Sequence, residues 1–332
     1  MIVREDIRLA PAGPVPRIEY IALAAGQPVG EDVLAAVVFG DAERRLNDPR
    51  CVCVGLESLS SPAVAEIWRG TGPVRIGFAG AVRYTMDEEF LAGAVELDER
   101  EYGGLAAAAR AAYSAIDRFQ SQSTHPHLLR MWNYFDGINR GEGDAERYKQ
   151  FCLGRAEGIG SRSPAEYPAA TAIGRRDGSP ILQIYWLAGR RPGVPLENPR
   201  QVSAYRYPRH YGPEAPRFSR AMLVSSRLLM ISGTASVIGH ASHHPGDLGA
   251  QLGATLENLA SLRHRAAASG GPGDEWSAST VLKIYLRERE MAATVASWLA
   301  EELPSPVQYM ILAADICRSE LLIEIDCLHQ QP

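Results

Sequence analysis

The sequence has no long apolar run and no excess of basic residues. None of its 332 residues falls in a window of about 18 consecutive apolar residues, so no transmembrane helix is expected. The opening residues, MIVREDIRL, contain no apolar core of signal-peptide length. The net charge of −5 argues against a nucleic-acid-binding protein, which carries a basic excess. These absences predict a protein with neither a membrane nor a nucleic acid as its partner.

Cysteine is scarce and unevenly placed. The chain has five cysteines, which are Cys51, Cys53, Cys152, Cys317 and Cys327. Their number is odd, and the C-x-C pair lies in an apolar run without a second pair at zinc spacing. Disulfides and structural zinc are therefore not expected, and the composition fits a reducing cytoplasm.

Several cofactor and hydrolase motifs are also missing. No G-x-S-x-G elbow, P-loop or G-x-G-x-x-G follows a predicted strand, which disfavours serine-hydrolase chemistry and nucleotide cofactors. A loop with His240, His243 and His244, followed by Asp247, offers possible metal ligands. Its spacing matches no common metal pattern, so no metal is predicted, and a metal-dependent hydrolase is the weakest hypothesis. We expect His240 to hydrogen-bond a substrate instead.

What is present is ordinary for a globular protein, with 46% apolar and 22% charged residues. The length predicts one large domain or two modest ones. Residues 1–100 are β-rich, with short apolar runs between Gly, Pro and Asp clusters. The expected strands are 18–25, 33–39, 51–56, 74–78 and 90–97. A helix at 99–120, a strand at 127–135 and a helix at 144–156 with Asp144 as N-cap follow.

The last third alternates between the two kinds of element. Strands are expected at 180–187, 228–231, 280–286, 307–316 and 321–327, with helices at 247–267 and 288–303. This order predicts an α/β (α+β) fold with mixed sheets and helices packed on one face. It loosely echoes the order of residues 15–155, which suggests two related halves. We expect an N-terminal β-rich α/β domain at 1–150 and a catalytic domain at 151–332.

Three stretches are candidates for a substrate site. In the helix 144–156, Tyr148 and Arg155 can share one face, although such a stripe is more often simple packing. The run YPRHYGP, which contains Tyr211, suits an anion site, and Arg220 follows it; the alternative is a solvated loop. The strand at 228–231 breaks into small residues, Gly233, Thr234, Ala235 and Ser236, that can line a pocket floor or form an ordinary turn before a helix.

The final strand places a carboxylate among apolar residues. Alternation puts Glu324 on the face opposite Ile323 and Ile325. If Glu324 is buried, its pKa rises and it becomes a candidate general acid. The alternative is a half-exposed sheet face. Cys317 lies seven residues earlier, across a turn, where a free and inert cysteine is the common outcome.

Taken together, these segments resemble the chorismatase family. The resemblance rests on Arg147-Tyr148 with Arg155, YPRHYGP, Phe218-Ser219-Arg220-Ala221, ISGTASVIGH and LLIEID, and covers residues 131–326. It implies a RidA (YjgF)-like C-terminal fold, whose closing strand carries an I-E-I-(D/E) signature, here 323–326. Residues 307–315 contain no arginine, whereas RidA-type deaminases place an essential arginine there, so imine hydrolysis is not expected.

The resemblance also implies the chemistry. Family members cleave chorismate and release pyruvate; they include 3-hydroxybenzoate synthases and the bacterial enzyme that supplies 3- and 4-hydroxybenzoate for aryl-polyene pigment and ubiquinone. It implies Glu324 as general acid and a cysteine at the place of Cys317 in aromatising members, without metal or organic cofactor. Tyr148, Arg155, Tyr211 and Arg220 would bind the substrate carboxylates, and Ala235 and Ser236 would admit or exclude water.

We therefore expect a cytoplasmic enzyme that forms 3-hydroxybenzoate, with 4-hydroxybenzoate as a further possible product. Two alternatives stay open. One is a chorismate hydrolase that gives a trans-dihydroxycyclohexadiene carboxylate. The other is a non-catalytic RidA-like protein that binds an aromatic acid. The assembly is expected to be a monomer or a homotrimer.

Overall fold

The computed structural model describes residues 13–22, 30–40, 48–59, 64–304 and 307–331. Near the N-terminus the chain forms a four-stranded sheet in the order β1-β4-β2-β3. Its strands are β1 (Arg17–Ala22), β2 (Val33–Phe39), β3 (Cys51–Val54) and β4 (Val64–Arg69). The expected strand at 33–39 is confirmed, and all seven of its residues are buried, as a continuous apolar run predicts. The end of the expected strand at 18–25 lies outside the described residues.

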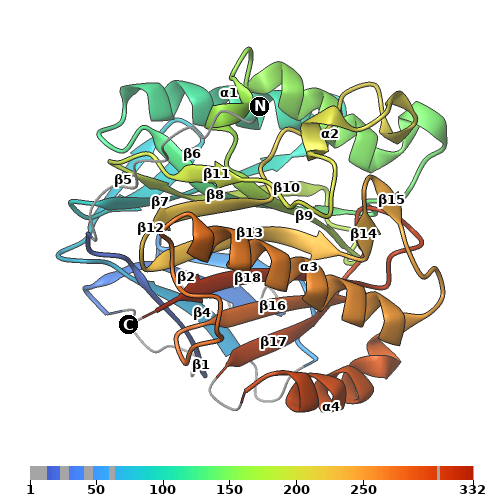
Figure 1. Cartoon of the computed structure of the whole chain (residues 1–332). Coiled ribbons are helices and arrows are strands. Elements are labelled where there is room, and N and C mark those ends of the chain that lie inside the picture. Colours follow the sequence, from blue (N-terminus) through green and yellow to red (C-terminus); the bar gives the residue numbers. More distant parts are fainter. Residues whose placement is uncertain (1–12, 23–29, 41–47, 60–63, 305–306, 332) are drawn as a thin grey trace, which may run out of the picture.

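Two six-stranded sheets follow, each with two helices (Figure 1). The second sheet has the order β5-β6-β7-β10-β8-β9 and comprises β5 (Arg75–Ala79), β6 (Val82–Met86), β7 (Phe90–Asp98), β8 (His127–Asp136), β9 (Ala169–Arg175) and β10 (Ile181–Gly189). Its helices are α1 (Leu105–Gln122) and α2 (Arg147–Gly158).

The third sheet has the order β11-β12-β13-β18-β16-β17. Its strands are β11 (Val194–Leu196), β12 (Ala221–Ser225), β13 (Leu228–Ala235), β16 (Val281–Leu286), β17 (Gln308–Ala313) and β18 (Ile323–Gln330). Its helices are α3 (Leu248–Ala268) and α4 (Ala292–Glu302), and a small hairpin joins β14 (Val237–Ile238) to β15 (Ala241–Ser242).

The two six-stranded sheets share one topology. In each, a hairpin leads to a helix, a strand, a second helix and a parallel neighbouring strand, and the last strand then inserts in the middle. This confirms an α/β fold with two related halves, although the equivalent segments are 75–189 and 194–330. The expected division at residue 150 falls inside α2, because β9 and β10 complete the second sheet after that point.

Two element ends differ from the expected caps. Asp144 is not the N-cap of α2, which begins at Arg147 after Glu146; the carboxylate of Asp144 pairs with Arg209 at 2.6 Å instead. The helix expected at 288–303 begins only at Ala292, because a short 3-10 helix precedes it. Asp247, in contrast, does cap α3, since its side chain accepts a hydrogen bond from the backbone of Ala250 at 2.9 Å.

The small-residue segment after Ile231 is not a turn. The strand β13 continues to Ala235, and the pairing register with β18 shifts between Ile231 and Thr234. Strand β18 is likewise longer than expected, and every one of its eight residues is buried. The half-exposed face considered for this strand is therefore wrong, because Glu324 is only 4% exposed.

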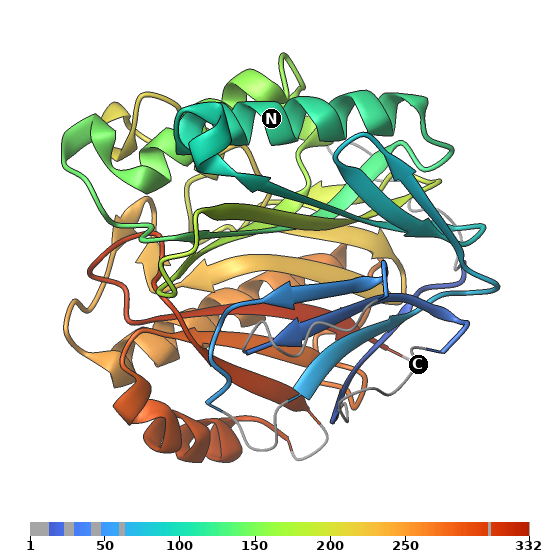
Figure 2. The ribbon, with the colours of Figure 1, turned by 180° about the vertical axis from the view of Figure 1, so that it is seen from behind.

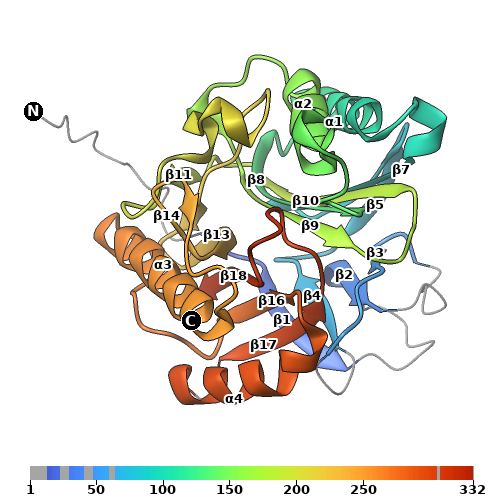
Figure 3. The same ribbon diagram turned by 90° about the vertical axis from the view of Figure 1, so that its right-hand side faces the viewer.

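The inner faces of the three sheets meet in one central core, and the helices lie outside the two larger sheets (Figures 2 and 3). Aromatic residues of the second sheet stack there, with Trp132 and Tyr185 at 4.8 Å between ring centroids. A fully buried ion pair joins Lys283 of β16 to Glu66 of β4 at 3.0 Å. None of the helices in the described ranges is long and apolar enough to span a membrane.

Candidate active site

A cavity of about 240 Å³ lies where the second and third sheets meet. Strands β9 and β13 approach each other there. The backbone N–H of Ala170 donates to the hydroxyl of Ser232 at 2.8 Å, and the N–H of Gly233 donates to the hydroxyl of Thr171 at 2.9 Å. The cavity thus draws its walls from both halves of the molecule.

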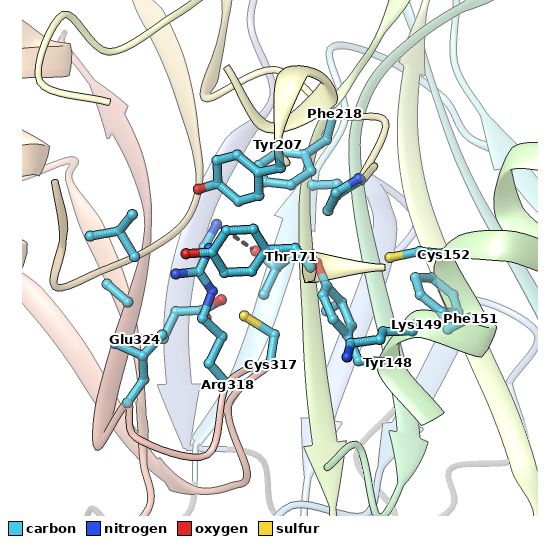
Figure 4. Close-up of a pocket in the computed structure, with 18 of the residues that line it drawn as sticks. Tyr148, Lys149, Phe151, Cys152, Thr171, Tyr207, Phe218, Cys317, Arg318 and Glu324 are labelled. Carbon is cyan, nitrogen blue, oxygen red and sulfur yellow. Dashed lines mark hydrogen bonds between the residues drawn. The ribbon is translucent and has the colours of Figure 1, made fainter. Parts of the chain in front are cut away.

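One wall of the cavity is a single face of α2. Tyr148, Phe151, Cys152 and Arg155 all line it, at spacings of three, four and seven residues that bring side chains together on a helix. Figure 4 shows Tyr148, Phe151 and Cys152 along this side, with Tyr207 and Phe218 at another. The structure therefore brings Tyr148 and Arg155 together, and the face that they share is a pocket wall.

Three arginines line the cavity, and the side chain of one of them makes no hydrogen bond or ion pair with the described residues. Arg155 is 3% exposed, yet none of its side-chain nitrogens hydrogen-bonds to another residue in the described ranges, and its guanidinium lies 5.2 Å from the ring of Tyr113. A buried guanidinium without an acceptor is costly unless an anion binds it. This wall therefore carries the signature of an anion site.

The other two arginines are held in place by aromatic rings. Arg220 donates to the hydroxyl of Tyr207 at 2.6 Å, and its Nε has no acceptor in the described part of the chain. Arg318 lies 4.1 Å from the ring centroid of Tyr211 and donates to the backbone oxygen of His240 at 2.9 Å. Both fixed guanidinium groups face the same cavity, which makes it strongly cationic.

Glu324 supplies the one deeply buried carboxyl group of the cavity lining. Burial, together with the negative charge of Asp326, raises its pKa to about 8. Arg130, Arg220 and Arg318 act in the opposite direction without cancelling this shift. Within the described residues its carboxyl oxygens make no hydrogen bond to protein groups. At neutral pH the group is therefore protonated and free to donate into the cavity.

Cys317 lies on the loop before β18, in the same cavity as Glu324 (Figure 4). Burial raises the pKa of its thiol well above the ordinary value, and the nearby carboxyl of Glu324 adds to the shift. Burial similarly raises the pKa of Cys152 to about 12. Both thiols are therefore neutral, so Cys317 is suited to carry a proton and not to act as a thiolate nucleophile.

Gly233 explains how Glu324 fits against β13. A Cβ atom at Gly233 would lie 1.9 Å from Oε1 of Glu324 and 3.2 Å from Cγ2 of Thr171. Only a residue without a side chain therefore leaves room for this carboxyl group.

We predict that Gly233→Ala displaces the Glu324 carboxyl and lowers kcat by about 100-fold, because a displacement of about 1 Å in a reacting group has that effect. Steady-state kinetics of the two variants checks this. Gly253→Ala is the matched control, since no atom lies within 4 Å of a Cβ added at that exposed helix position. Equal kcat values for the two variants would contradict the proposed fit.

Not every expected site residue lines the cavity. Tyr148, Arg155, Tyr211, Arg220, Gly233, Ala235, Cys317 and Glu324 do. Thr234 and Ser236 do not, because alternation along β13 turns them away from the side on which Gly233 and Ala235 lie. The Thr234 hydroxyl donates to the backbone of Ser232 at 2.8 Å, and that of Ser236 donates to the backbone of His243 at 3.0 Å.

His240 stands behind the cavity wall. Its Nδ1 lies 3.2 Å from the hydroxyl of Tyr211, so it positions that tyrosine and does not reach the cavity itself. Among the described residues, no group of three or more His, Cys, Asp or Glu side chains is arranged to hold a metal ion. His240 therefore supports Tyr211 and Arg318, two residues of the cavity wall.

Some lining residues carry no signal that sequence reasoning used. Thr171 lies on β9, a strand that was not expected, and Arg318 directly follows Cys317 in a tight turn. Tyr207 belongs to the YPRHYGP run, but only the ring contacts with Arg220 and Arg318 show its role.

Known proteins resemble this chain in both sequence and structure. A model of the family "Chorismatase FkbO/Hyg5-like, N-terminal" matches residues 66–188. A chorismatase from Streptomyces rapamycinicus is 36% identical over 280 residues, covering 79% of this chain and 81% of the relative. A 3-hydroxybenzoate synthase from Streptomyces hygroscopicus is 37% identical over 278 residues, covering 79% and 80%.

A solved structure matches almost the whole chain. The crystal structure of a chorismatase superposes with a TM-score of 0.84 at 31% identity and covers 95% of this chain and 98% of its own. Fold and cavity define a two-half α/β protein whose cavity is lined by a buried carboxyl with a raised pKa and by three arginines. The chain belongs to the chorismatase family.

Proposed function

We propose that this protein cleaves chorismate into pyruvate and 3-hydroxybenzoate, with Glu324 as the general acid. The observation that carries this proposal is the buried carboxyl of Glu324, which is protonated at neutral pH inside an arginine-lined cavity. The relatives named chorismatase and 3-hydroxybenzoate synthase support the choice of substrate and product.

The arginines suit the charge of the substrate. Chorismate carries two carboxylates, one on the ring and one on the enolpyruvyl group. Arg155 and Arg220 line the cavity, the Nε of each has no acceptor among the described residues, and Arg318 adds a third guanidinium. Planar guanidinium groups bind carboxylates in a forked geometry, so the cavity offers a site for each carboxylate. Tyr148 and Tyr211 line the cavity beside them.

The reaction begins when Glu324 donates its proton to the methylene carbon of the enolpyruvyl group. That carbon becomes the methyl group of pyruvate, and an oxocarbenium ion forms, which the Glu324 carboxylate stabilises. The oxygen of the neighbouring ring hydroxyl then attacks the ring carbon that bears the ether. The ring carbon–oxygen bond breaks, and its electron pair completes the keto group of pyruvate.

Aromatisation follows without any outside reactant. The ring hydroxyl releases its proton to the Glu324 carboxylate, which restores the acid, and an epoxide-like intermediate forms. Protonation of the epoxide oxygen opens it, and loss of one ring proton gives hydroxybenzoate. The neutral thiol of Cys317 lines the cavity and is suited to this proton exchange. Atoms balance, because chorismate equals hydroxybenzoate plus pyruvate.

The pH dependence follows from the raised pKa of Glu324. A general acid must be protonated, so kcat should be level near neutral pH and fall about tenfold per pH unit above the pKa of about 8. The rate of pyruvate formation, measured between roughly pH 6 and 10, checks this. Circular dichroism at each pH confirms that the fold is intact. A rate that rises through pH 9 would exclude Glu324 as the proton donor.

The decisive assay is incubation of the purified protein with chorismate and separation of the products. We expect equimolar pyruvate and 3-hydroxybenzoate. A dihydroxycyclohexadiene carboxylate in place of the aromatic product would instead show hydrolysis, and 4-hydroxybenzoate would show a different ring opening. If chorismate binds but no pyruvate forms, the protein is an aromatic-acid binder and the proposal fails.

A further inference from the structure

A second buried carboxyl group lies on the same strand as Glu324. Asp326 is two residues further along β18, so both side chains point to the same face of the third sheet. Asp326 is 1% exposed and does not line the cavity. The mechanism above assigns it no step.

Every polar contact that the structure gives to the Asp326 carboxylate is with a donor. Its Oδ2 accepts from Nε1 of Trp132 at 2.9 Å and from the hydroxyl of Tyr285 at 3.0 Å. The hydroxyl of Thr171 donates to it at 3.3 Å, and the guanidinium of Arg130 lies 3.4 Å away. A carboxylate can accept from all of these donors, whereas a protonated carboxyl would need an acceptor for its own proton.

One of the donors to Asp326, Thr171, also lines the cavity. Thr171 accepts from Arg130 and from the backbone N–H of Gly233, and the same Gly233 packs against the Glu324 carboxyl. Hydrogen bonds that cross between the second and third sheets therefore link Asp326, through Thr171, to Gly233, which lies against Glu324.

The negative charge of Asp326 is partly balanced by Lys283 in the central core. Lys283 is the cross-strand neighbour of Asp326 in the pairing of β16 with β18, and it forms its ion pair with Glu66 of the N-terminal sheet at 3.0 Å. Burial lowers the pKa of Lys283, but the carboxylates of Asp326 and Glu66 more than offset this and raise it. The lysine stays charged, and Glu66 shares it, so Lys283 does not neutralise Asp326 alone.

We propose that Asp326 is a positioning residue of the reaction: its fixed negative charge keeps the neighbouring Glu324 carboxyl protonated and ready to donate. This inference rests on the proposed role of Glu324 as the acid. A second negative charge two residues away on the same face of a buried strand disfavours ionisation of the first, as in other paired carboxylates.

Other groups facing Glu324 act with or against Asp326. Arg130 of β8, Arg220 before β12 and Arg318 of the loop before β18 favour the ionised form. The neighbouring Cys317 and Tyr148 are neutral, since burial raises the pKa of both. On the adjoining strands, the residues opposite Glu324 are Ala235 and Tyr285, which carry no charge. Among these groups, the negative charge of Asp326 opposes the effect of the three arginines on the ionisation of Glu324.

The test follows the ionisation of Glu324 without substrate. The infrared band of the protonated Glu324 carboxyl, assigned by its loss in Glu324→Gln, is titrated in the full-length protein. We expect Asp326→Asn to move this titration to lower pH by about one unit or more. The alkaline fall in kcat should move with it. Asp326→Glu, which keeps the charge, should restore the wild-type titration.

The control is Asp87→Asn, which removes a buried carboxylate that accepts from the backbone of Phe90 at 2.7 Å and does not line the cavity. Its titration should match the wild type. If Asp326→Asn does not fold, Glu66→Gln decides, because it leaves Lys283 to act on Asp326 alone and should shift the titration in the same direction. An unchanged Glu324 titration in the folded variant would overturn the proposal.

The infrared readout separates this inference from the proposed function. If the titration shifts as expected but chorismate is not cleaved, the proposed function fails while the coupling of the two carboxylates stands. If chorismate is cleaved but the titration does not shift, burial alone keeps Glu324 protonated, and Asp326 has no such role.

Discussion

Glu324→Gln is expected to lower kcat for chorismate cleavage by about 10²–10⁴-fold, because the amide cannot supply the proton that the enolpyruvyl carbon needs. The amide has nearly the shape of the carboxyl, so the cavity and substrate affinity should persist. Steady-state kinetics and equilibrium binding of chorismate check the two statements separately.

The matched control for this variant is Glu320→Gln. Glu320 lines the same cavity but is exposed to solvent. We expect near-wild-type kcat from it. Near-wild-type turnover by Glu324→Gln would remove Glu324 from the mechanism, whatever the control shows.

The same substitution has a predicted effect on stability. The folded-state pKa of Glu324, about 8, lies above its ordinary value, so the native state binds this proton more tightly than the unfolded state does. The contribution of Glu324 to stability is then largest below its ordinary pKa and is lost as the pH rises through about 8. Glu324→Gln should therefore flatten the decline of the free energy of unfolding over this pH range. A cooperative unfolding transition in the same measurement shows that the variant is folded, so misfolding would not explain its lost turnover.

The second large effect concerns the core. Lys283→Met should lower the free energy of unfolding by about 3–5 kcal/mol, since it leaves the fully buried Glu66 carboxylate without its cation. Denaturant unfolding monitored by tryptophan fluorescence measures this. Tryptophan fluorescence is sensitive to this site because the ring of Trp132 lies 4.9 Å from the Lys283 ammonium group.

The only other lysine of the chain provides the comparison. Lys149 pairs with Glu146 at 3.3 Å near the surface, and Lys149→Met should cost no more than about 1 kcal/mol. The double variant Lys283→Met with Glu66→Gln should recover part of the loss, because it removes the unpaired charge as well. A loss below about 1 kcal/mol for Lys283→Met alone would show that the ion pair does not hold the sheets together.

The local parts of the fold were predictable from the sequence. Continuous apolar runs marked strands such as 33–39, helical spacing marked the pocket face of α2, and Asp247 marked the start of α3. These features depend on residues close together in the chain. The alternation that placed Glu324 among apolar neighbours was of the same kind.

What the sequence could not reveal depends on distant pairings. Strands β10 and β18 come last in their halves of the chain yet lie in the middle of their sheets, and no local pattern encodes that position. The seam between β9 and β13 brings Thr171 beside Gly233 across 62 residues of sequence. For the same reason the histidine loop looked like a ligand site, while its actual contact, from His240 to Tyr211, spans 29 residues.

The central claim is that a protein acid, exchangeable with solvent, protonates the enolpyruvyl methylene. The measurement that tests it most directly is the reaction of chorismate in D₂O, with immediate reduction of the pyruvate to lactate and mass analysis of its methyl group. We predict one deuterium in each methyl group, because the Glu324 carboxyl exchanges with solvent before it donates. Pyruvate with an unlabelled methyl group would mean that the hydrogen came from the chorismate ring itself, which would contradict the account.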